Sequence, residues 1–212
     1  RTVADMFKAA GSKRMVSVDL HSGQIQGFFE GPVDHLTAMP VLEKYLRENA
    51  REGVVIVSPD TGRVKVAERF AQHLADMGAD VAFVYKKRER NSVNVSSAKE
   101  VIGDVDGRLC VLTDDMIDTA GTIVSAAELL KARGAKEVWA MATHGVLSDP
   151  AIERLKKSPI SRVVLTNTIP LSKEKRFDRI EVLSVAKIIA DALAAVFEET
   201  SVSELFGGEN LA

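Results

Sequence analysis

The chain has 212 residues, 46% of them hydrophobic and 27% charged, with a formal net charge of −2 at pH 7. This length and composition predict a globular protein of one large or two small domains. The small net charge gives no electrostatic footprint for nucleic acid, and no apolar run reaches the roughly eighteen residues of a membrane span. We therefore expect a cytoplasmic protein that binds neither nucleic acid nor a membrane. The single cysteine, Cys110, excludes an internal disulfide and lies in an apolar run that predicts a buried, inert thiol.

The amino-terminal segment predicts a helix and then a strand. Residues 2–10 have a helical pattern that ends at Gly11, and neither a signal peptide nor an initiator methionine precedes them. We therefore expect an upstream part of the protein to be missing from this sequence. Residues 16–20 predict an apolar strand that places His21 at its carboxyl end, although a lone histidine is usually structural.

From residue 54 onward, short β-branched runs alternate with amphipathic helical stretches, which indicates βαβ units and a mainly parallel sheet flanked by helices. The further strands are expected at 54–58, 81–85, 109–113, 138–142 and 163–166. The helices are expected at 40–49, 64–77, 122–133, 149–157 and 185–198, with glycine just beyond the second and third.

A tight turn after the strand at 54–58 opens the helix at 64–77. It is formed by Asp60, Thr61, Gly62 and Arg63. Its geometry suits a phosphate or a metal-bound phosphate, because backbone N–H groups at the start of a helix attract anions. Mg²⁺ is typically held by one or two protein groups plus phosphate oxygens and water, so the Asp60 carboxylate would suffice. Taken without context, the same residues predict an ordinary turn.

A polar loop is expected from residue 86 to residue 100. It begins with the cations Lys86, Lys87 and Arg88, and it is long for a connection inside a compact domain. A cationic loop beside a phosphate site suggests a closing lid. The alternative is a solvated run of charges.

The strongest signal follows the strand at 109–113, where Asp114 and Asp115 precede a small-residue turn that opens a helix. Backbone N–H groups from Thr119 to Thr122 would hold a monophosphate at the positive helix end. Adjacent carboxylates repel anions but accept hydrogen bonds from neighbouring hydroxyls, so ribose hydroxyls beside a bound 5-phosphate are the natural ligand. The alternative is a capped polar turn in which Asp118 or Thr119 serves as the N-cap.

Other polar and aromatic residues carry no predicted chemical step. His35 and His73 have no ligand spacing around them, which favours structural or surface roles, and His144 follows the strand at 138–142 without an assigned role. Tyr45 and Trp139 are expected in the core or in an interface, and Phe28 and Phe29 are expected to pack.

The run at 109–122 resembles the phosphoribosyl-pyrophosphate binding motif of type I phosphoribosyltransferases and ribose-phosphate pyrophosphokinases. The run at 18–29, with Asp19, Leu20 and His21, is similar to the signature of the pyrophosphokinases. The resemblance implies a type I phosphoribosyltransferase-like α/β fold, with a mainly parallel twisted sheet flanked by helices and the remainder of a second, similar domain. The implied division is 1–38 as the remainder of an N-terminal domain, 39–184 as a C-terminal domain with the sugar-phosphate loop, 185–206 as a helix packing back on the N-terminal domain, and 207–212 as a flexible tail.

The resemblance also implies roles for individual residues. Asp114 and Asp115 contact the ribose of ribose 5-phosphate. The loop for its 5-phosphate is formed by Asp118, Thr119, Ala120, Gly121 and Thr122. The pyrophosphate loop is formed by Asp60, Thr61, Gly62 and Arg63. His21 and Asp60 are the ligands of Mg²⁺, Lys86 is the catalytic lysine, and Arg88 is a catalytic arginine that also contacts the sugar phosphate. Many relatives have glycine in place of Ala120 and of Arg63, so Arg63 either adds a phosphate contact or faces solvent.

The implied activity is that of a ribose-phosphate diphosphokinase. Such an enzyme moves the β,γ-pyrophosphoryl group of ATP to the 1-hydroxyl of ribose 5-phosphate, which yields phosphoribosyl pyrophosphate and AMP for nucleotide biosynthesis. Family members assemble as homo-oligomers, commonly hexamers, and draw most ATP contacts from an N-terminal segment that this chain lacks. The 212-residue form can therefore bind the sugar phosphate and still be inactive. Two alternatives stay open, namely a phosphoribosyltransferase and a non-catalytic regulatory paralogue of the synthetase.

Overall fold

The computed structural model describes residues 1–87, 98–202 and 204. The chain divides into two compact units, Val41–Leu183 and a smaller unit made of Arg1–Pro40 and Ser184–Ala212. Among the residues that the structure describes, no helix has the length and apolar character needed to cross a membrane.

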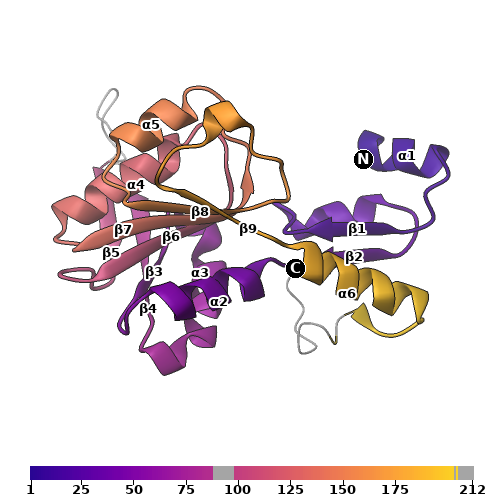
Figure 1. Cartoon of the computed structure of the whole chain (residues 1–212), viewed down its shortest axis with the longest axis horizontal. Helices are drawn as coiled ribbons and strands as arrows, with labels where there is room; N and C mark the ends of the chain where they lie inside the picture. The colour runs from indigo at the N-terminus through magenta and orange to yellow at the C-terminus, as the bar shows by residue number, and fades with distance from the viewer. Residues whose placement is uncertain (88–97, 203, 205–212) are drawn as a thin grey trace. The chain divides into compact units, whose positions relative to one another are not determined.

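The larger unit is built on a seven-stranded sheet in the order β5-β4-β3-β6-β7-β8-β9 (Figure 1). Its strands are β3 (Val55–Ser58), β4 (Asp80–Lys87), β5 (Ala98–Ile102), β6 (Leu109–Ile117), β7 (Glu137–Gly145), β8 (Arg162–Thr166) and β9 (Ile180–Leu183). Every neighbouring pair is parallel except β4 and β5, which are antiparallel. The predicted α/β class with a mainly parallel sheet is therefore confirmed.

Helices cover both faces of this sheet, as Figure 1 shows. The helices are α2 (Met39–Asn49), α3 (Val64–His73), α4 (Gly121–Ala132) and α5 (Ala151–Lys157), with short 3-10 turns η2 (Thr61–Arg63), η3 (Ala75–Met77) and η4 (Lys173–Lys175). α4 buries one stripe, Ile123, Ala126, Ala127 and Leu130, whose spacing places the four side chains on one face of the helix. That stripe packs in one core cluster with side chains of β3, β6, β7 and β8.

Tyr45 and Trp139 lie on the other face of the sheet, where α2 meets β7. Their ring centroids are 6.4 Å apart in an edge-on arrangement, and both side chains are buried. The guanidinium of Arg162 lies 4.4 Å from the Trp139 ring centroid. These two aromatic residues were expected in the core or in an interface, and both are buried in the core. Cys110 is also fully buried in β6, and burial raises the pKa of its thiol to about 11.

Three predicted boundaries were wrong. β6 does not stop at residue 113 but continues to Ile117, because β7 extends beside it and pairs with Asp114, Met116 and Ile117. The helix expected at 64–77 ends at His73 and continues as the 3-10 turn η3, closed by Gly78 at φ +64°. The expected polar loop contains the edge strand β5, whose mixed polar and apolar side chains hide a strand pattern.

The smaller unit contains α1 (Thr2–Ala9), β1 (Met15–Val18), η1 (Gly23–Phe28), β2 (Val33–Leu36) and α6 (Ala186–Phe197). β1 and β2 form a parallel two-stranded sheet with Val18 opposite Leu36. α1 and α6 lie within a residue or two of their predicted bounds, whereas β2 was not predicted. Phe29 is buried as expected, whereas Phe28 is 44% exposed. The tail expected at 207–212 lies outside the described residues.

Candidate functional site

The carboxyl end of β6 and the start of α4 form a small phosphate-sized cavity. It has a volume of about 100 Å³ and is lined by Asp114 and by residues 116–123. Ala120 is the N-cap of α4, with φ 60° and ψ 6°, and its side chain gives no capping hydrogen bond. The first-turn N–H groups of a helix have no partner within the helix. The turn therefore presents uncapped backbone donors to the cavity, and the reading of Asp118 or Thr119 as the N-cap was wrong.

The left-handed conformation of Ala120 is held from outside the loop. A residue with a Cβ adopts this conformation at a cost of roughly 1–2 kcal/mol, so neighbouring contacts must stabilise it. Nη1 of Arg154, which comes from α5, donates a hydrogen bond of 3.0 Å to the carbonyl oxygen of Thr119. This bond fixes the peptide that enters Ala120. Sequence reasoning missed Arg154, because it lies 35 residues from Thr119 in an ordinary amphipathic helix.

Asp114 and Asp115 lie within β6 rather than after it. The Asp115 side chain is 2% exposed and that of Asp114 is 24% exposed. The backbone N–H of Asp115 donates to Oδ1 of Asp114 at 2.8 Å. Burial, followed by interaction with the Asp115 carboxyl, raises the pKa of Asp114 to about 7. A carboxyl whose pKa lies near neutral pH therefore lines this cavity.

The turn of residues 60–63 lies beside these acids, because β3 and β6 are parallel neighbours whose carboxyl ends share one edge of the sheet. Oδ1 of Asp60 accepts a hydrogen bond of 2.8 Å from the Gly62 N–H, which closes the turn. Thr61 and Gly62 are exposed. Arg63 directs its guanidinium to the acids of β6, with Nη2 2.6 Å from Oδ1 of Asp115 and Nε 3.6 Å from Oδ1 of Asp114. Of the two alternatives for Arg63, the one in which it faces solvent was wrong, since its side chain is only 19% exposed.

Lys86 lies inside β4, next to β3, so its backbone belongs to the same edge of the sheet as Asp60. It pairs with Lys99 of β5 and does not begin a loop, because β4 continues to Lys87. Arg88 lies outside the described residues, as do the next nine positions of the expected lid, 89–97.

His21 follows β1 in the smaller unit and is exposed. The neighbouring His35 fixes the segment that leads to it, because Nε2 of His35 accepts a hydrogen bond of 2.9 Å from the Leu20 N–H. Half-burial lowers the pKa of His35, which favours the neutral ring that this acceptor role needs. The predicted structural role of His35 is confirmed, and His73 is likewise structural, with Nδ1 2.6 Å from Oε1 of Glu43.

The residues present fit a metal ion only in combination with a bound phosphate. Within residues 1–87, 98–202 and 204, no group of three His, Cys, Asp or Glu side chains could hold a metal ion. Mg²⁺ commonly takes one or two protein groups and completes its shell with phosphate oxygens and water. The single Asp60 carboxylate, in a turn predicted to bind phosphate, fits that kind of site, whereas the described residues do not form a metal site from protein groups alone.

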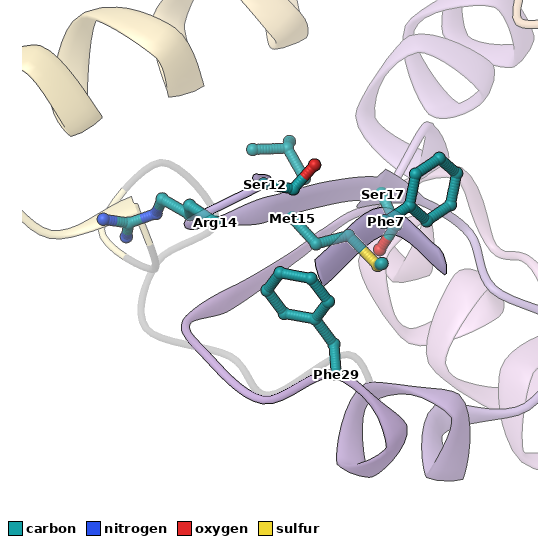
Figure 2. A pocket seen from close by; sticks show the side chains of 7 residues that line it. Phe7, Ser12, Arg14, Met15, Ser17 and Phe29 are labelled. Carbon is teal, nitrogen blue, oxygen red and sulfur yellow. The ribbon is translucent and has the colours of Figure 1, made fainter. Parts of the chain in front are cut away.

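A larger cavity of about 340 Å³ lies in the smaller unit (Figure 2). It is lined by Phe7, Ser12, Arg14, Met15, Val16, Ser17 and Phe29. The charge of Arg14 is already matched, because Nε and Nη2 donate to the Asp34 carboxylate at 2.5 and 3.1 Å. The remaining lining is mostly apolar, so we assign this cavity no chemical step.

Comparisons with known proteins agree with this geometry. Residues 90–207 match the family model described as the phosphoribosyl synthetase-associated domain. The chain is 54% identical over 209 residues to a ribose-phosphate pyrophosphokinase of Bifidobacterium longum, and this match covers 97% of the chain and 61% of the relative. It is 50% identical over 210 residues to the one of Mycobacterium tuberculosis, with 99% of the chain and 64% of the relative covered.

Among solved structures, the fold resembles a phosphoribosylpyrophosphate synthetase from Mycobacterium smegmatis. The TM-score is 0.85 at 50% identity, and the match covers 93% of this chain and 63% of that one. The chain thus spans less than two thirds of the length of these relatives.

Proposed function

The chain belongs to the ribose-phosphate pyrophosphokinase family, and on that basis we propose that it carries the sugar-phosphate half of a ribose-phosphate diphosphokinase. The whole enzyme transfers the β,γ-pyrophosphoryl group of ATP to the 1-hydroxyl of ribose 5-phosphate. The products are phosphoribosyl pyrophosphate and AMP. The observation that carries the proposal is the meeting of an acid pair, a phosphate cavity and a second phosphate-binding turn at one edge of the sheet.

The sugar site uses the two features of β6 and α4. Backbone N–H groups of the turn at Asp118, Thr119, Ala120, Gly121 and Thr122 bind the 5-phosphate, which the positive end of α4 attracts. Asp114 and Asp115 accept hydrogen bonds from the ribose hydroxyls. Holding the sugar at both ends orients its 1-hydroxyl, and good alignment of this kind can supply roughly 7–11 kcal/mol of a barrier.

The pyrophosphate side uses the turn at Asp60, Thr61 and Gly62. Mg²⁺ bound there would neutralise charge on the phosphates, and Asp60 would supply a carboxylate ligand. On the family resemblance we also propose His21 as a magnesium ligand. Lys86 and Arg88 supply positive charge to the transferring oxygens. The 1-hydroxyl attacks the β-phosphorus in line, the bond from that phosphorus to the AMP oxygen breaks, and the hydroxyl proton is released. Positioning and charge neutralisation supply most of the catalysis in such transfers.

We further propose the domain assignment that the resemblance implies, with 39–184 as a phosphoribosyltransferase-like domain, 1–38 as the remainder of a second one, and 185–206 packing back on it. A homo-oligomer, in the family a hexamer, and a cytoplasmic location complete the proposal.

A phosphorus NMR assay tests the proposal directly. The 212-residue chain and any longer form of the protein are incubated with Mg-ATP and ribose 5-phosphate, and AMP and the pyrophosphorylated sugar are followed over time. We expect the 212-residue chain to bind ribose 5-phosphate and a form of the relatives' length to make both products. Binding without turnover by the longer form would point instead to a regulatory paralogue. Absence of sugar-phosphate binding by either form would refute the site.

A further inference from the structure

Arg63 connects the turn that follows β3 to the acidic residues within β6. It lies at the end of η2, directly after β3, and its guanidinium reaches the acids of β6 rather than the open side of its own turn. The Asp115 carboxylate that it contacts is 2% exposed. The distance of 2.6 Å between Nη2 of Arg63 and Oδ1 of Asp115 is that of a close ion pair.

The acid pair needs such a cation. Two adjacent carboxyls that are shielded from water repel each other when both are ionised, so one of them retains a proton unless a positive charge lies close by. The charged groups that act on Asp114 are Asp115 and Arg63, with opposite signs. The backbone N–H of Asp115 and the charge of Arg63 both favour the ionised form of Asp114, and an ionised carboxylate is the stronger acceptor for a sugar hydroxyl.

We propose that Arg63 is a positioning residue of the sugar site, whose guanidinium holds Asp114 and Asp115 in the orientation that accepts the ribose hydroxyls. This inference rests on the proposed function, because it takes ribose 5-phosphate as the ligand of the acid pair. It moves Arg63 from the pyrophosphate loop, where the resemblance placed it, to the sugar site. The turn after β3 then serves both ligands, with Asp60 on the pyrophosphate side and Arg63 on the sugar side.

The pH dependence of sugar binding separates this role from simple loop stabilisation. With Arg63 present, the pKa of Asp114 is about 7, and the arginine lowers it against the effects of burial and of Asp115. Removal of the positive charge raises that pKa further, so the pH at which sugar binding develops moves upward. A residue that only stabilised the fold would change the affinity without moving this midpoint.

The test measures the binding of ribose 5-phosphate to the 212-residue chain by calorimetry. This chain is suitable because Arg63, Asp114 and Asp115 all lie in the unit Val41–Leu183. Arg63→Gln removes the charge at similar side-chain length, Arg63→Lys keeps the charge, and Lys65→Ala removes an exposed cation from the first turn of α3 as a matched control. Titrations run from about pH 6 to pH 9, across the range in which a raised carboxyl pKa is read out. Thermal unfolding of each variant checks that it is folded.

We expect Arg63→Gln to weaken binding about tenfold at neutral pH, as expected for the loss of one charged interaction. Its binding midpoint should move to higher pH. Arg63→Lys should retain most of the affinity and a midpoint near that of the wild type. If Arg63→Gln fails to fold, the affinity and midpoint of Arg63→Lys test the proposal instead. Lys65→Ala should match the wild type.

Mg-pyrophosphate is titrated in parallel to test whether Arg63 contacts pyrophosphate instead of the sugar site. If Arg63→Gln or Arg63→Lys weakens pyrophosphate binding while sugar binding and its midpoint stay unchanged, Arg63 is a pyrophosphate contact and the inference is wrong. Unchanged binding of both ligands would also overturn it. If the wild-type chain itself does not bind ribose 5-phosphate, the proposed sugar site fails first and this inference fails with it.

Discussion

The raised pKa of Asp114 predicts that the ligand-free protein loses stability as the pH rises towards 7. Asp114→Asn is the informative change, because asparagine keeps an oxygen to accept the Asp115 N–H and cannot ionise. Between about pH 4 and pH 7, the unfolded chain loses the Asp114 proton whereas the folded chain retains it. Raising the pH through this window therefore lowers the free energy of unfolding of the wild type.

The size of the effect follows from the pKa. A rise from 3.8 to about 7 corresponds to at most about 4 kcal/mol of unfolding free energy. Because Asp115 and Arg63 share the local charge, we expect Asp114→Asn to gain about 2 kcal/mol near pH 8 and very little near pH 4. The same variant should bind ribose 5-phosphate more weakly, because an amide is a poorer acceptor than a carboxylate.

Urea unfolding of the 212-residue chain at several pH values measures the stability difference, and calorimetry measures the affinity. Glu128→Gln, which removes an exposed acid of α4, is the control and should follow the wild type. A stability difference that does not change with pH, or a loss of stability in Asp114→Asn near pH 8, would refute the reasoning about the charge of Asp114. A gain in stability with unchanged sugar affinity would refute only its contact with the sugar.

Three further changes test other parts of the site. Lys86→Ala should lower kcat of the active enzyme by orders of magnitude and leave ribose 5-phosphate affinity nearly intact, which initial-rate and binding measurements test. An equal loss of affinity would contradict a role confined to the transition state. Arg154→Ala should weaken ribose 5-phosphate binding several-fold in calorimetry, because it frees the Thr119 carbonyl, whereas wild-type affinity would show that the loop holds itself. Cys110 should resist maleimide labelling near pH 8 in the folded chain and react after unfolding, because the buried thiol has a pKa of about 11. Fast labelling of the folded chain would contradict the burial of Cys110.

The sequence alone determined the fold class, and it predicted a phosphate loop from Asp114 to Thr122. Alternation of β-branched runs with amphipathic stretches is a local pattern, and it predicted five of the seven strands of the large sheet. The run from Asp114 to Thr122 is also local, because its acids, small residues and helix start are consecutive. Its position at the carboxyl end of a parallel strand follows from the order of elements along the chain.

The tertiary structure decided which loops meet. β6 extends to Ile117 only because β7 lies beside it and supplies backbone partners, and this pairing places Asp114 and Asp115 inside the sheet. Arg63 meets them because β3 is the neighbour of β6, although β4 and β5 intervene in sequence. Strand order depends on how the helices pack on the sheet, and no local pattern records it. The contact between Arg63 and the acids, like the hydrogen bond from Arg154 to Thr119, is therefore visible only in the folded chain, because packing brings together residues that are distant in sequence.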